Sequence, residues 1–250
     1  MALTILVTGA TAGFGAAMAR RFVREGHRVI AAARRVDRLR DLGAALGDAL
    51  LALPLDVSDK AAVAALPDSL PPDWRAVDVL VNNAGMAVGQ EPAYTCDVAD
   101  WDRMVAVNVT GTMHMTHAFL PAMVARNRGH IVNISSTAAI YPYPGGHVYG
   151  ASKAFITQFS LNLRADLVGT NVRVTDLEPG LVGGTEFSVH RFGGDESRAV
   201  AVYAGTRPLS ADDIADAAYY AISLPPHMNI NRMEIMPTCQ APGPLAIKRS

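Results

Sequence analysis

The sequence predicts an α/β protein built on one Rossmann-type, doubly wound parallel sheet with helices on both faces, and three observations lead to this fold class. Short aliphatic segments recur along the 250 residues, and each is apolar on both faces, as strands covered by helices must be. Longer amphipathic segments lie between most of them. No Pro/Ser-rich linker, repeat or low-complexity tract divides the chain, so residues 1–250 are expected to form a single domain.

The alternation of strands and helices predicts how the sheet is connected. Right-handed crossovers bring the carboxyl ends of parallel strands to one edge, where the ligands of such sheets bind. The expected strands are Leu3–Val7, Val29–Ala33, Leu50–Leu55, Val77–Val81, Ile131–Ile134, Val172–Leu177 and Met233–Met236. The expected helices are Gly13–Glu25, Ala99–Arg126, Ala151–Leu167 and Ala211–Ser223.

The first strand leads into a glycine-rich turn and then a helix. Residues 8–15 are TGATAGFG, with the spacing G-x-x-x-G-x-G in place of the general dinucleotide fingerprint G-x-G-x-x-G. Glycine lets the backbone turn tightly and lets a pyrophosphate approach main-chain N–H groups at a helix N-terminus. A plain glycine turn is the alternative. The residues expected to bind dinucleotide phosphates are Gly9, Ala10, Thr11, Ala12, Gly13, Phe14 and Gly15.

The end of the second strand predicts which dinucleotide binds. NAD-binding folds place an Asp or Glu about 20 residues after the glycine turn, where it binds the ribose 2′-hydroxyl. This chain has Arg34 and Arg35 there and no carboxylate. Arginine binds phosphate bidentately and stays charged at physiological pH. We therefore expect NADP, with both arginines at its 2′-phosphate; the alternative is that they begin a solvated helical turn with Arg38 and Arg40.

The third and fourth strands also end in residues suited to a nucleotide. Asp56, followed by Val57, is placed to accept a hydrogen bond from an adenine amino group. Asn83, Ala84 and Gly85 form a small-residue turn against which a flat ring or a ribose can lie. Ordinary strand-end caps are the alternative interpretation of both segments.

A tyrosine and a lysine stand four residues apart beyond the fifth strand. On a helix, Tyr149 and Lys153 project from one face about one turn apart. The ammonium is expected to lower the pKa of the phenol from about 10 towards the range useful for proton transfer. A chance surface pair is the alternative. Ser136 follows the fifth strand, and no charged residue lies between Arg128 and Lys153, so these groups are expected to share a partly dry cleft.

Taken together, six motifs in this order resemble the short-chain dehydrogenase/reductase family over essentially the whole chain. They are Thr8-Gly-x3-Gly-x-Gly, Asn82-Asn-Ala-Gly, Asn108, Ser136, Tyr149-x3-Lys153 and Pro179-Gly180. Within the family, the chain looks most like the NADP-dependent 3-hydroxy acid dehydrogenases, which act on serine, allo-threonine, 3-hydroxypropionate and 3-hydroxyisobutyrate. The segments that carry this likeness are Thr8–Gly15, Asn127–His130, Gln158–Arg164, Glu178–Phe187, Asn229–Asn231 and Glu234–Pro237.

The resemblance implies a role for each matching residue. Tyr149 would be the general acid/base, and Lys153 would lower its pKa while holding the nicotinamide ribose. Ser136 would bind the substrate oxygen, and Asn108 would hold a water that links Lys153 to solvent. The segment from Pro179 to Phe187 would wrap the nicotinamide amide and the diphosphate. Its candidate cofactor contacts are Pro179, Gly180, Val182 and Thr185.

Two departures from the pattern of that group bear on the substrate range. Ser135 replaces a glycine and His147 replaces an asparagine, both beside the expected substrate cleft. A carboxylated substrate needs a cation there, and Arg191 is the candidate because Lys153 already serves the ribose and the tyrosine. A solvated arginine on a mobile loop is the alternative.

Three other functions are alternatives to a hydroxy acid dehydrogenase. A sulfonated aldehyde such as sulfoacetaldehyde would keep the same chemistry. An acyl-carrier reductase is disfavoured, since residues 237–240 are PTCQ where those enzymes usually have a diglycine. A non-catalytic, NADP-sensing binding protein is disfavoured because such proteins tend to lose the tyrosine or the lysine.

Charge and composition exclude several other classes of protein. With 22 basic and 23 acidic residues, the chain lacks the basic excess of a nucleic-acid binder. The first nineteen residues are uncharged, but glycines interrupt them too often for a membrane span, and no basic residue precedes Arg20 as in a signal peptide. Cys96 and Cys239 are too few for a disulfide framework, which suits the cytoplasm.

Two helices of the central region bear on metals and on assembly. His114 and His117 have no third ligand at zinc-type spacing, so no metal site is expected. The stretches Ala99–Arg126 and Ala151–Leu167 are apolar on more than one face, which indicates burial on more than one side. In the family these helices commonly pair across a twofold axis, and we expect a homotetramer.

Overall fold

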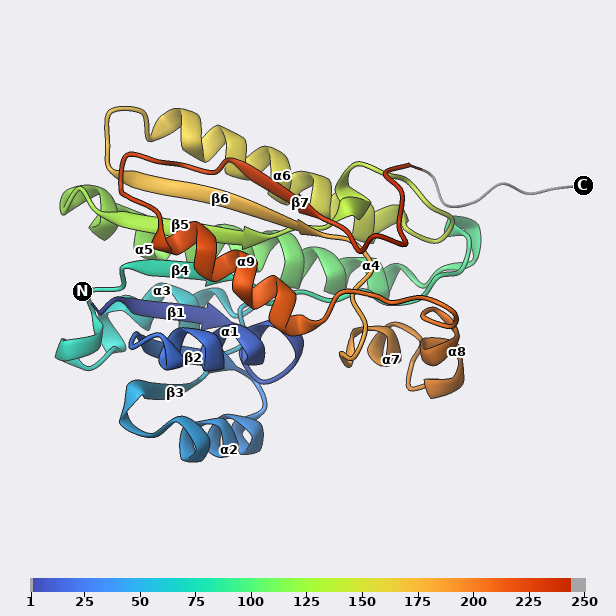
Figure 1. Ribbon diagram of the computed structural model, residues 1–250, viewed down its shortest axis with the longest axis horizontal. Helices are drawn as coiled ribbons and strands as arrows, with labels where there is room; N and C mark the ends of the chain where they lie inside the picture. Colours follow the sequence, from blue (N-terminus) through green and yellow to red (C-terminus); the bar gives the residue numbers. More distant parts are fainter. Residues whose placement is uncertain (1, 244–250) are drawn as a thin grey trace, which may run out of the picture.

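The computed structural model describes residues 2–243, so both ends of the predicted 1–250 domain lie outside the described residues. Within this range seven strands form one sheet, in which every neighbouring pair is parallel and the order is β3-β2-β1-β4-β5-β6-β7 (Figure 1). The predicted doubly wound parallel sheet is confirmed. The strands are β1 (Thr4–Thr8), β2 (Arg28–Ala33), β3 (Leu50–Pro54), β4 (Val79–Asn82), β5 (Gly129–Ile134), β6 (Val172–Pro179) and β7 (Arg232–Ile235).

Helices connect the strands along the chain. The α-helices are α1 (Gly13–Arg24), α2 (Val36–Leu46), α3 (Lys60–Ser69), α4 (Val98–Met104), α5 (Thr112–Ala125), α6 (His147–Asp166), α7 (Phe187–Arg191), α8 (Glu196–Ala201) and α9 (Ala211–Ser223). A π-helical segment, η4 (Val105–Gly111), joins α4 to α5. Short 3₁₀ turns lie at Gly47–Ala49, Pro72–Trp74, Ala93–Thr95 and Thr137–Ala139.

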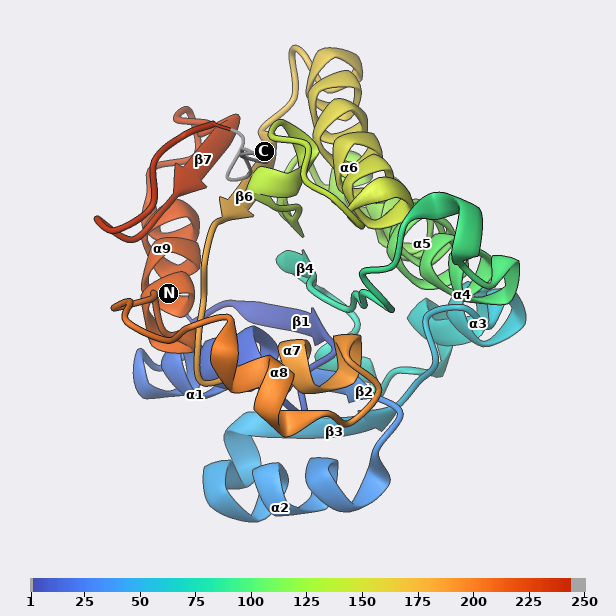
Figure 2. The ribbon, with the colours of Figure 1, turned by 90° about the vertical axis from the view of Figure 1, so that its right-hand side faces the viewer.

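Two apolar cores hold these helices on opposite faces of the sheet. On one face Phe22 of α1, Leu42 of α2 and Ile222 of α9 are buried against the strands. On the other face Leu66 of α3 and Phe119 of α5 are buried, with residues of α6 beside them. Figure 2, which looks onto the carboxyl ends of the strands, shows α1, α2 and α9 separated by the sheet from α3, α5 and α6, with α7 and α8 in front. Of the residues described, no helix combines the length and apolarity that crossing a bilayer requires.

The observed helices differ from the expected ones at the places that shape the site. Helices α2, α3, α7 and α8 lie outside the helical stretches named from the sequence, and each buries no more than two residues. The single helix expected over Ala99–Arg126 contains the π-helical segment η4 in its middle. Helix α6 begins at His147, four residues before the predicted start at Ala151, since Gly150 N–H already donates to Gly146 O at 2.6 Å.

Candidate active site

The glycine turn after β1 requires glycine for steric reasons. Gly9 and Gly13 have φ angles of +67° and +48°, in the left-handed region that disfavours side chains. A Cβ atom on Gly15 would lie 2.3 Å from Gly9 O and 2.6 Å from Asn83 Nδ2. The turn therefore holds its backbone against the end of β4, and no larger residue fits at Gly15.

The N-terminus of α1 is open to an anion. Its N-cap residue, Ala12, has an extended backbone, supplies no side-chain cap, and no acidic residue lies in the first turn. The first N–H groups of a helix carry partial positive charge and lack partners within the helix, so they bind phosphate well. A dinucleotide diphosphate fits this donor set, as predicted for residues 9–15.

The side chain of Asn83 hydrogen-bonds to the backbone of the glycine turn. Its side-chain Nδ2 donates to Thr8 O at 2.8 Å and Gly9 O at 3.3 Å. The Thr8 hydroxyl accepts hydrogen bonds from Asn83 N–H and Ala84 N–H at 3.0 and 2.9 Å. Residues 83–85 follow the end of β4, and the Asn83 side chain is occupied in joining β4 to β1.

The arginines expected at a 2′-phosphate lie at the carboxyl end of β2 and in the first turn of α2. Arg35 Nε donates to Thr11 Oγ1 at 3.3 Å, and Arg35 Nη1 lies 2.8 Å from Glu186 Oε2. Arg34 lies across from Asp56, with a shortest N–O distance of 3.9 Å, and its side chain is 70% exposed. Arg38, 3.5 Å from Glu186, joins them. Arg35 thus contacts the glycine turn, Arg34 does not, and each of the two has a carboxylate beside it, Glu186 and Asp56 respectively.

The residues expected at an adenine are divided between surface and core. Asp56 Oδ1 accepts hydrogen bonds from Ser58 N–H at 2.9 Å and from the Ser58 hydroxyl at 2.7 Å. Its other carboxylate oxygen lies towards Arg34. The side chain of Val57 is buried and packs against Gly111, where a Cβ would lie 2.8 Å from it. A nucleotide could therefore reach the Asp56 carboxylate and the Val57 backbone, but not the Val57 side chain.

Helix α6 brings Tyr149 and Lys153 together as the spacing predicts. Both lie in its first two turns, with Lys153 Nζ 5.8 Å from the Tyr149 ring centroid. Lys153 Nζ donates to Ile134 O at 2.8 Å, which ties it to the end of β5. Ser136 is hydrogen-bonded to the Tyr149 side chain and donates to Pro179 O at 3.4 Å. The three groups predicted to share a cleft are therefore in mutual reach.

The direction of the tyrosine pKa differs from the expectation. Burial raises the pKa of Tyr149 to about 12, although the hydrogen bond with Ser136 and the charge of Arg191 oppose the change. Burial also lowers the pKa of Lys153 to about 8, and the charge of Asp176 opposes that change. Lys153 is not among the groups that shift the Tyr149 pKa here, so its predicted lowering by the ammonium stays a prediction, while desolvation sets the net upward direction.

Asn108 lies behind the lysine in the π-helical segment η4. Its Oδ1 accepts from Met86 N–H at 2.8 Å, and its Nδ2 donates to Met86 O at 2.9 Å and Ser152 Oγ at 3.0 Å. A Cβ on Gly85 would stand 3.3 Å from Lys153 Nζ and 3.4 Å from Asn108 Oδ1. π-Helical turns inside α-helices are frequent at functional sites. Here the π-helical segment η4 carries Asn108 on the side of Gly85 and Lys153.

The segment after β6 covers the glycine turn. Thr185 lies against Gly13, whose Cβ position would be 3.6 Å from the Thr185 side chain. Val182 is buried and forms a β-bridge with Leu209. A Cβ on Gly180 would lie 2.4 Å from Gln240 Oε1, so a larger residue there would have to displace the Gln240 side chain. Of the predicted cofactor contacts, Pro179 ends β6 and Thr185 reaches the glycine turn.

Arg191 projects from the end of α7 into the same cleft as Tyr149. Its guanidinium carbon lies 5.7 Å from the Tyr149 ring centroid and 5.2 Å from that of Tyr143. Arg191 Nη2 donates to the Tyr143 hydroxyl at 2.9 Å, and Nε donates to Gly89 O at 3.2 Å. The Phe187 ring also packs against the Tyr149 ring, with centroids 5.7 Å apart. The guanidinium is therefore fixed beside the catalytic candidate and is not free on a loop.

A cavity of about 370 Å³ opens on the far side of Arg191 and is lined by residues that the sequence did not connect. Cys96 is among them, and its Sγ lies 3.2 Å from His147 Nε2. The His147 ring packs against Trp101, with centroids 5.1 Å apart. His147 Nδ1 accepts from Val148 N–H at 3.0 Å, so Nε2 carries the proton of the neutral ring and points towards Cys96. His147 thus contacts two of the residues that line this cavity, Cys96 and Trp101.

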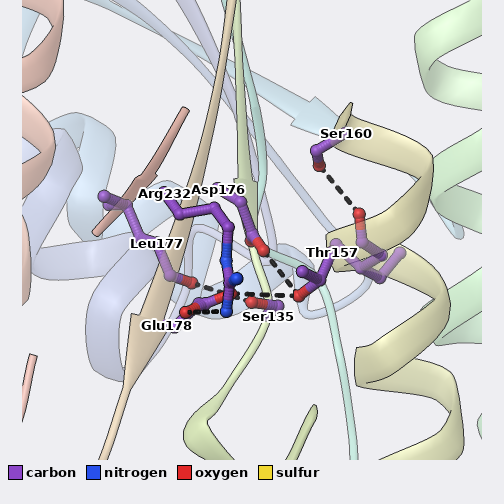
Figure 3. A network of polar contacts seen from close by, with 8 residues as sticks. Ser135, Thr157, Ser160, Asp176, Leu177, Glu178 and Arg232 are labelled. Carbon is purple, nitrogen blue, oxygen red and sulfur yellow. Dashed lines mark hydrogen bonds and ion pairs between the residues drawn. The ribbon is translucent and has the colours of Figure 1, made fainter. Parts of the chain in front are cut away.

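Asp176 and Glu178 of β6 are completely buried, and Figure 3 shows their side chains in a polar network with Thr157 of α6 and Arg232 of β7. The Thr157 hydroxyl lies 2.7 Å from Asp176 Oδ2 and 3.2 Å from Glu178 Oε1. Glu178 forms a two-pronged ion pair with Arg232 at 2.8 and 3.0 Å. Burial raises the pKa of Asp176 to about 7, opposed by hydrogen bonds from Thr157 and Ser135. Strand patterns alone did not reveal this cluster, because Asp176 and Glu178 interrupt a segment expected to be apolar.

No group of three or more His, Cys, Asp or Glu side chains in residues 2–243 is arranged to hold a metal ion. What the described site offers is a helix N-terminus with an open anion position, a cluster of arginines, and a phenol, a hydroxyl and an ammonium within one cleft.

Comparison with known proteins places this geometry in a family. The sequence profile of the short chain dehydrogenase family matches residues 3–193, and the chain belongs to that family. Over 248 residues it is 55% identical to the NADP-dependent 3-hydroxy acid dehydrogenase YdfG of Salmonella typhi, covering 99% of this chain and 100% of the relative. It is 48% identical over 241 residues to serine 3-dehydrogenase of Agrobacterium fabrum, with 96% of each chain covered.

Solved structures agree with these relatives. The fold matches the closed form of a serine dehydrogenase complexed with NADP⁺ with a TM-score of 0.96 at 53% identity, covering 99% of this chain and 100% of the other. Serine dehydrogenase from Escherichia coli matches with a TM-score of 0.85 at 50% identity, covering 96% and 100%. The likeness therefore extends over the entire described fold and not over the nucleotide half alone.

Proposed function

We propose that the protein is an NADP-dependent oxidoreductase that transfers hydride between NADP(H) and the 3-hydroxyl or 3-oxo carbon of a small hydroxy acid. The proposed substrates are serine, allo-threonine, 3-hydroxypropionate and 3-hydroxyisobutyrate, or their oxidised forms. The observation that carries the proposal is the meeting of Tyr149, Ser136 and Lys153 in one cleft at the sheet edge that also holds the glycine turn. Full-length relatives named for this chemistry support it.

The proposed cofactor contacts follow from the geometry of the strand ends. Residues 9–15 would take the diphosphate on the N-terminus of α1, and Arg34 and Arg35 the 2′-phosphate. Asp56 and Val57 would lie at the adenine, and residues 83–85 at the ribose. The segment 179–185 would cover the nicotinamide end. When bound, the oxidised cofactor supplies a hydride acceptor and a positive charge that favours the phenolate of Tyr149.

In the proposed mechanism the protein's own groups handle the proton. Tyr149 accepts the proton of the substrate hydroxyl in oxidation and returns a proton to the carbonyl oxygen in reduction. Ser136, hydrogen-bonded to the Tyr149 side chain, holds the substrate oxygen beside it. Lys153 holds the ribose, and Asn108 positions a water that links Lys153 to solvent.

Arg191 is the proposed partner of the substrate carboxylate. Its guanidinium is held over the tyrosine ring by Tyr143 and Gly89, so a carboxylate bound to it would lie next to the reacting carbon. Two of its bonds go to neutral oxygens, and its remaining N–H groups are the donors that a carboxylate would need.

Assembly, location and domain organisation complete the proposal. We infer a homotetramer in the cytoplasm, with residues 1–250 as one domain. Large apolar side chains exposed along the central helices support the assembly, because a monomer gains nothing from leaving them in water. They are Val98, Val105, Met113, Val124 and Phe155. Light scattering of the purified protein at micromolar concentration would return the mass of four chains.

A screen of NADP⁺ reduction tests the function. Serine, allo-threonine, 3-hydroxypropionate and 3-hydroxyisobutyrate should each give NADPH, and isethionate little. If isethionate is oxidised in preference to the hydroxy acids, the proposed substrate class would change from carboxylates to sulfonates. A protein that binds NADP⁺ but reduces it with none of the five compounds would refute the enzyme and favour a cofactor-sensing role.

A further inference from the structure

Glu186 connects the segment over the nucleotide site to the arginines at the end of β2. Its Oε2 lies 2.8 Å from Arg35 Nη1, and its Oε1 lies 3.5 Å from Arg38 Nη2. His190, one turn later, lies 3.6 Å from the same carboxylate. The hydrogen bond from Arg35 holds the pKa of Glu186 below its usual value, so the carboxylate is charged at neutral pH.

The contacts around Glu186 join three parts of the chain that are far apart in sequence. Arg35 and Glu186 are separated by 151 positions. The same guanidinium donates to Thr11 of the glycine turn through Nε. Thr185, next to Glu186, lies against Gly13 of that turn. Docking of residues 180–191 and the position of the arginine cluster are therefore linked through one carboxylate.

Counting donors shows that a phosphate does not have to displace Glu186. A guanidinium has five N–H groups. Arg35 uses one on Thr11 and one on Glu186, which leaves three in the plane of the fork. A phosphate can accept two of these while the carboxylate stays in place. An arginine held on two sides also loses less conformational entropy when the phosphate arrives than a free one would.

We propose that Glu186 is a positioning residue that presents Arg35 and Arg38 to the 2′-phosphate of NADP and thereby couples binding of that phosphate to docking of residues 180–191. The inference rests on the proposed NADP dependence. Coupling of this kind is reciprocal, so the 2′-phosphate strengthens the docking of the segment by the same factor by which docking strengthens phosphate binding. Competition between the carboxylate and the phosphate for Arg35 predicts the opposite sign.

Binding of adenosine 2′,5′-bisphosphate, which carries the 2′-phosphate but no nicotinamide, tests the proposal without turnover. By titration calorimetry, Glu186→Gln should bind it about 5- to 20-fold more weakly than the wild type, and should bind adenosine 5′-monophosphate equally well. Asp37→Asn is the matched control. It also removes one negative charge, from the first turn of α2, but Asp37 pairs with Arg40 and not with Arg35 or Arg38. It should bind as the wild type does or slightly more tightly.

A double-mutant cycle separates positioning from a general change in the segment. In a background that carries both Arg35→Met and Arg38→Met, the further change Glu186→Gln should have no effect on bisphosphate binding, because neither arginine that Glu186 contacts is then present. Tighter binding by Glu186→Gln alone would overturn the proposal in favour of competition. An equal loss in both backgrounds, or an equal loss for the monophosphate, would assign Glu186 to the stability of the segment only.

Trypsin reports the docking of the segment directly, since Arg191 and Arg198 lie in or just after it. The bisphosphate should slow cleavage there several-fold in the wild type and in Asp37→Asn, and should leave the cleavage rate of Glu186→Gln unchanged. Equal protection of all three proteins would overturn the coupling. A wild type that binds NADP⁺ no better than NAD⁺ would instead refute the proposed cofactor, an outcome distinct from any of these.

Discussion

We expect Asp176→Asn to gain stability over the wild type as the pH rises from 5 to 8. Burial, opposed by hydrogen bonds from Thr157 and Ser135, raises the pKa of Asp176 from 3.8 to about 7. The native protein therefore binds more protons than the unfolded chain between these two values, and the wild type loses stability as the pH rises through them. Asparagine has no proton to lose and can still donate to Glu178, so the variant avoids this loss.

The size of the effect follows from the pKa difference. The gap from 3.8 to about 7 corresponds to roughly 4 kcal/mol at pH 8, at ~1.4 kcal/mol per pH unit. At pH 5, about one unit above the unfolded value, only roughly 2 kcal/mol is lost. The difference between variant and wild type should therefore grow by about 2 to 3 kcal/mol over this range. Lys153, whose pKa is about 8, changes stability in the opposite direction only at higher pH.

Urea unfolding followed by tryptophan fluorescence at pH 5, 6, 7 and 8 measures this difference. Asp213→Asn is the control, because hydrogen bonds from Ser210 lower the pKa of Asp213 and its contribution is complete above pH 5. That control should be less stable than the wild type by a constant amount. Parallel curves for the wild type and Asp176→Asn would refute the raised pKa of the buried Asp176 carboxyl.

The remaining predictions concern the reaction. Tyr149→Phe should fold and bind NADPH but lose at least the roughly 10²–10⁴-fold that general acid/base catalysis contributes to kcat; near-normal turnover would exclude Tyr149 as the proton donor. Replacing Arg34 and Arg35 together should weaken NADP⁺ binding by a few kcal/mol, at ~1.5–3 kcal/mol per charge-assisted hydrogen bond, and leave NAD⁺ binding nearly unchanged. An unaltered NADP⁺-to-NAD⁺ ratio would place the discrimination elsewhere. Arg191→Met should raise KM for carboxylated substrates far more than for an uncharged short-chain alcohol, and equal losses on both would mean that Arg191 only orders its segment.

The features that the sequence predicted well are those that depend on residues close together in the sequence. The strand cores, the glycine turn and the Tyr149–Lys153 pair each follow from residues within a few positions of one another. Apolar β-branched segments favour buried strands, glycines permit positive φ, and a spacing of four gives one helix face. The carboxyl ends of parallel strands meet at one edge, so the location of the site also follows from the pattern.

What the local pattern did not predict depends on contacts across the fold. The pairs Arg35–Glu186 and Cys96–His147 join residues 151 and 51 positions apart, and Thr157 reaches Asp176 only because α6 lies on the face to which that carboxyl points. The Tyr149 pKa is the clearest case. A charge four residues away predicts a lower value, whereas burial by the whole cleft raises it to about 12.

The sequence by itself therefore determined the parallel sheet, its glycine turn and the pairing of Tyr149 with Lys153, because short-range sterics and helical or strand periodicity decide those features. The tertiary structure alone decided which side chains meet, which are desolvated and which carboxylate holds which arginine. Those outcomes depend on strand register and on how α6 and the 180–191 segment pack, and burial of a charge is a property of all the surroundings together.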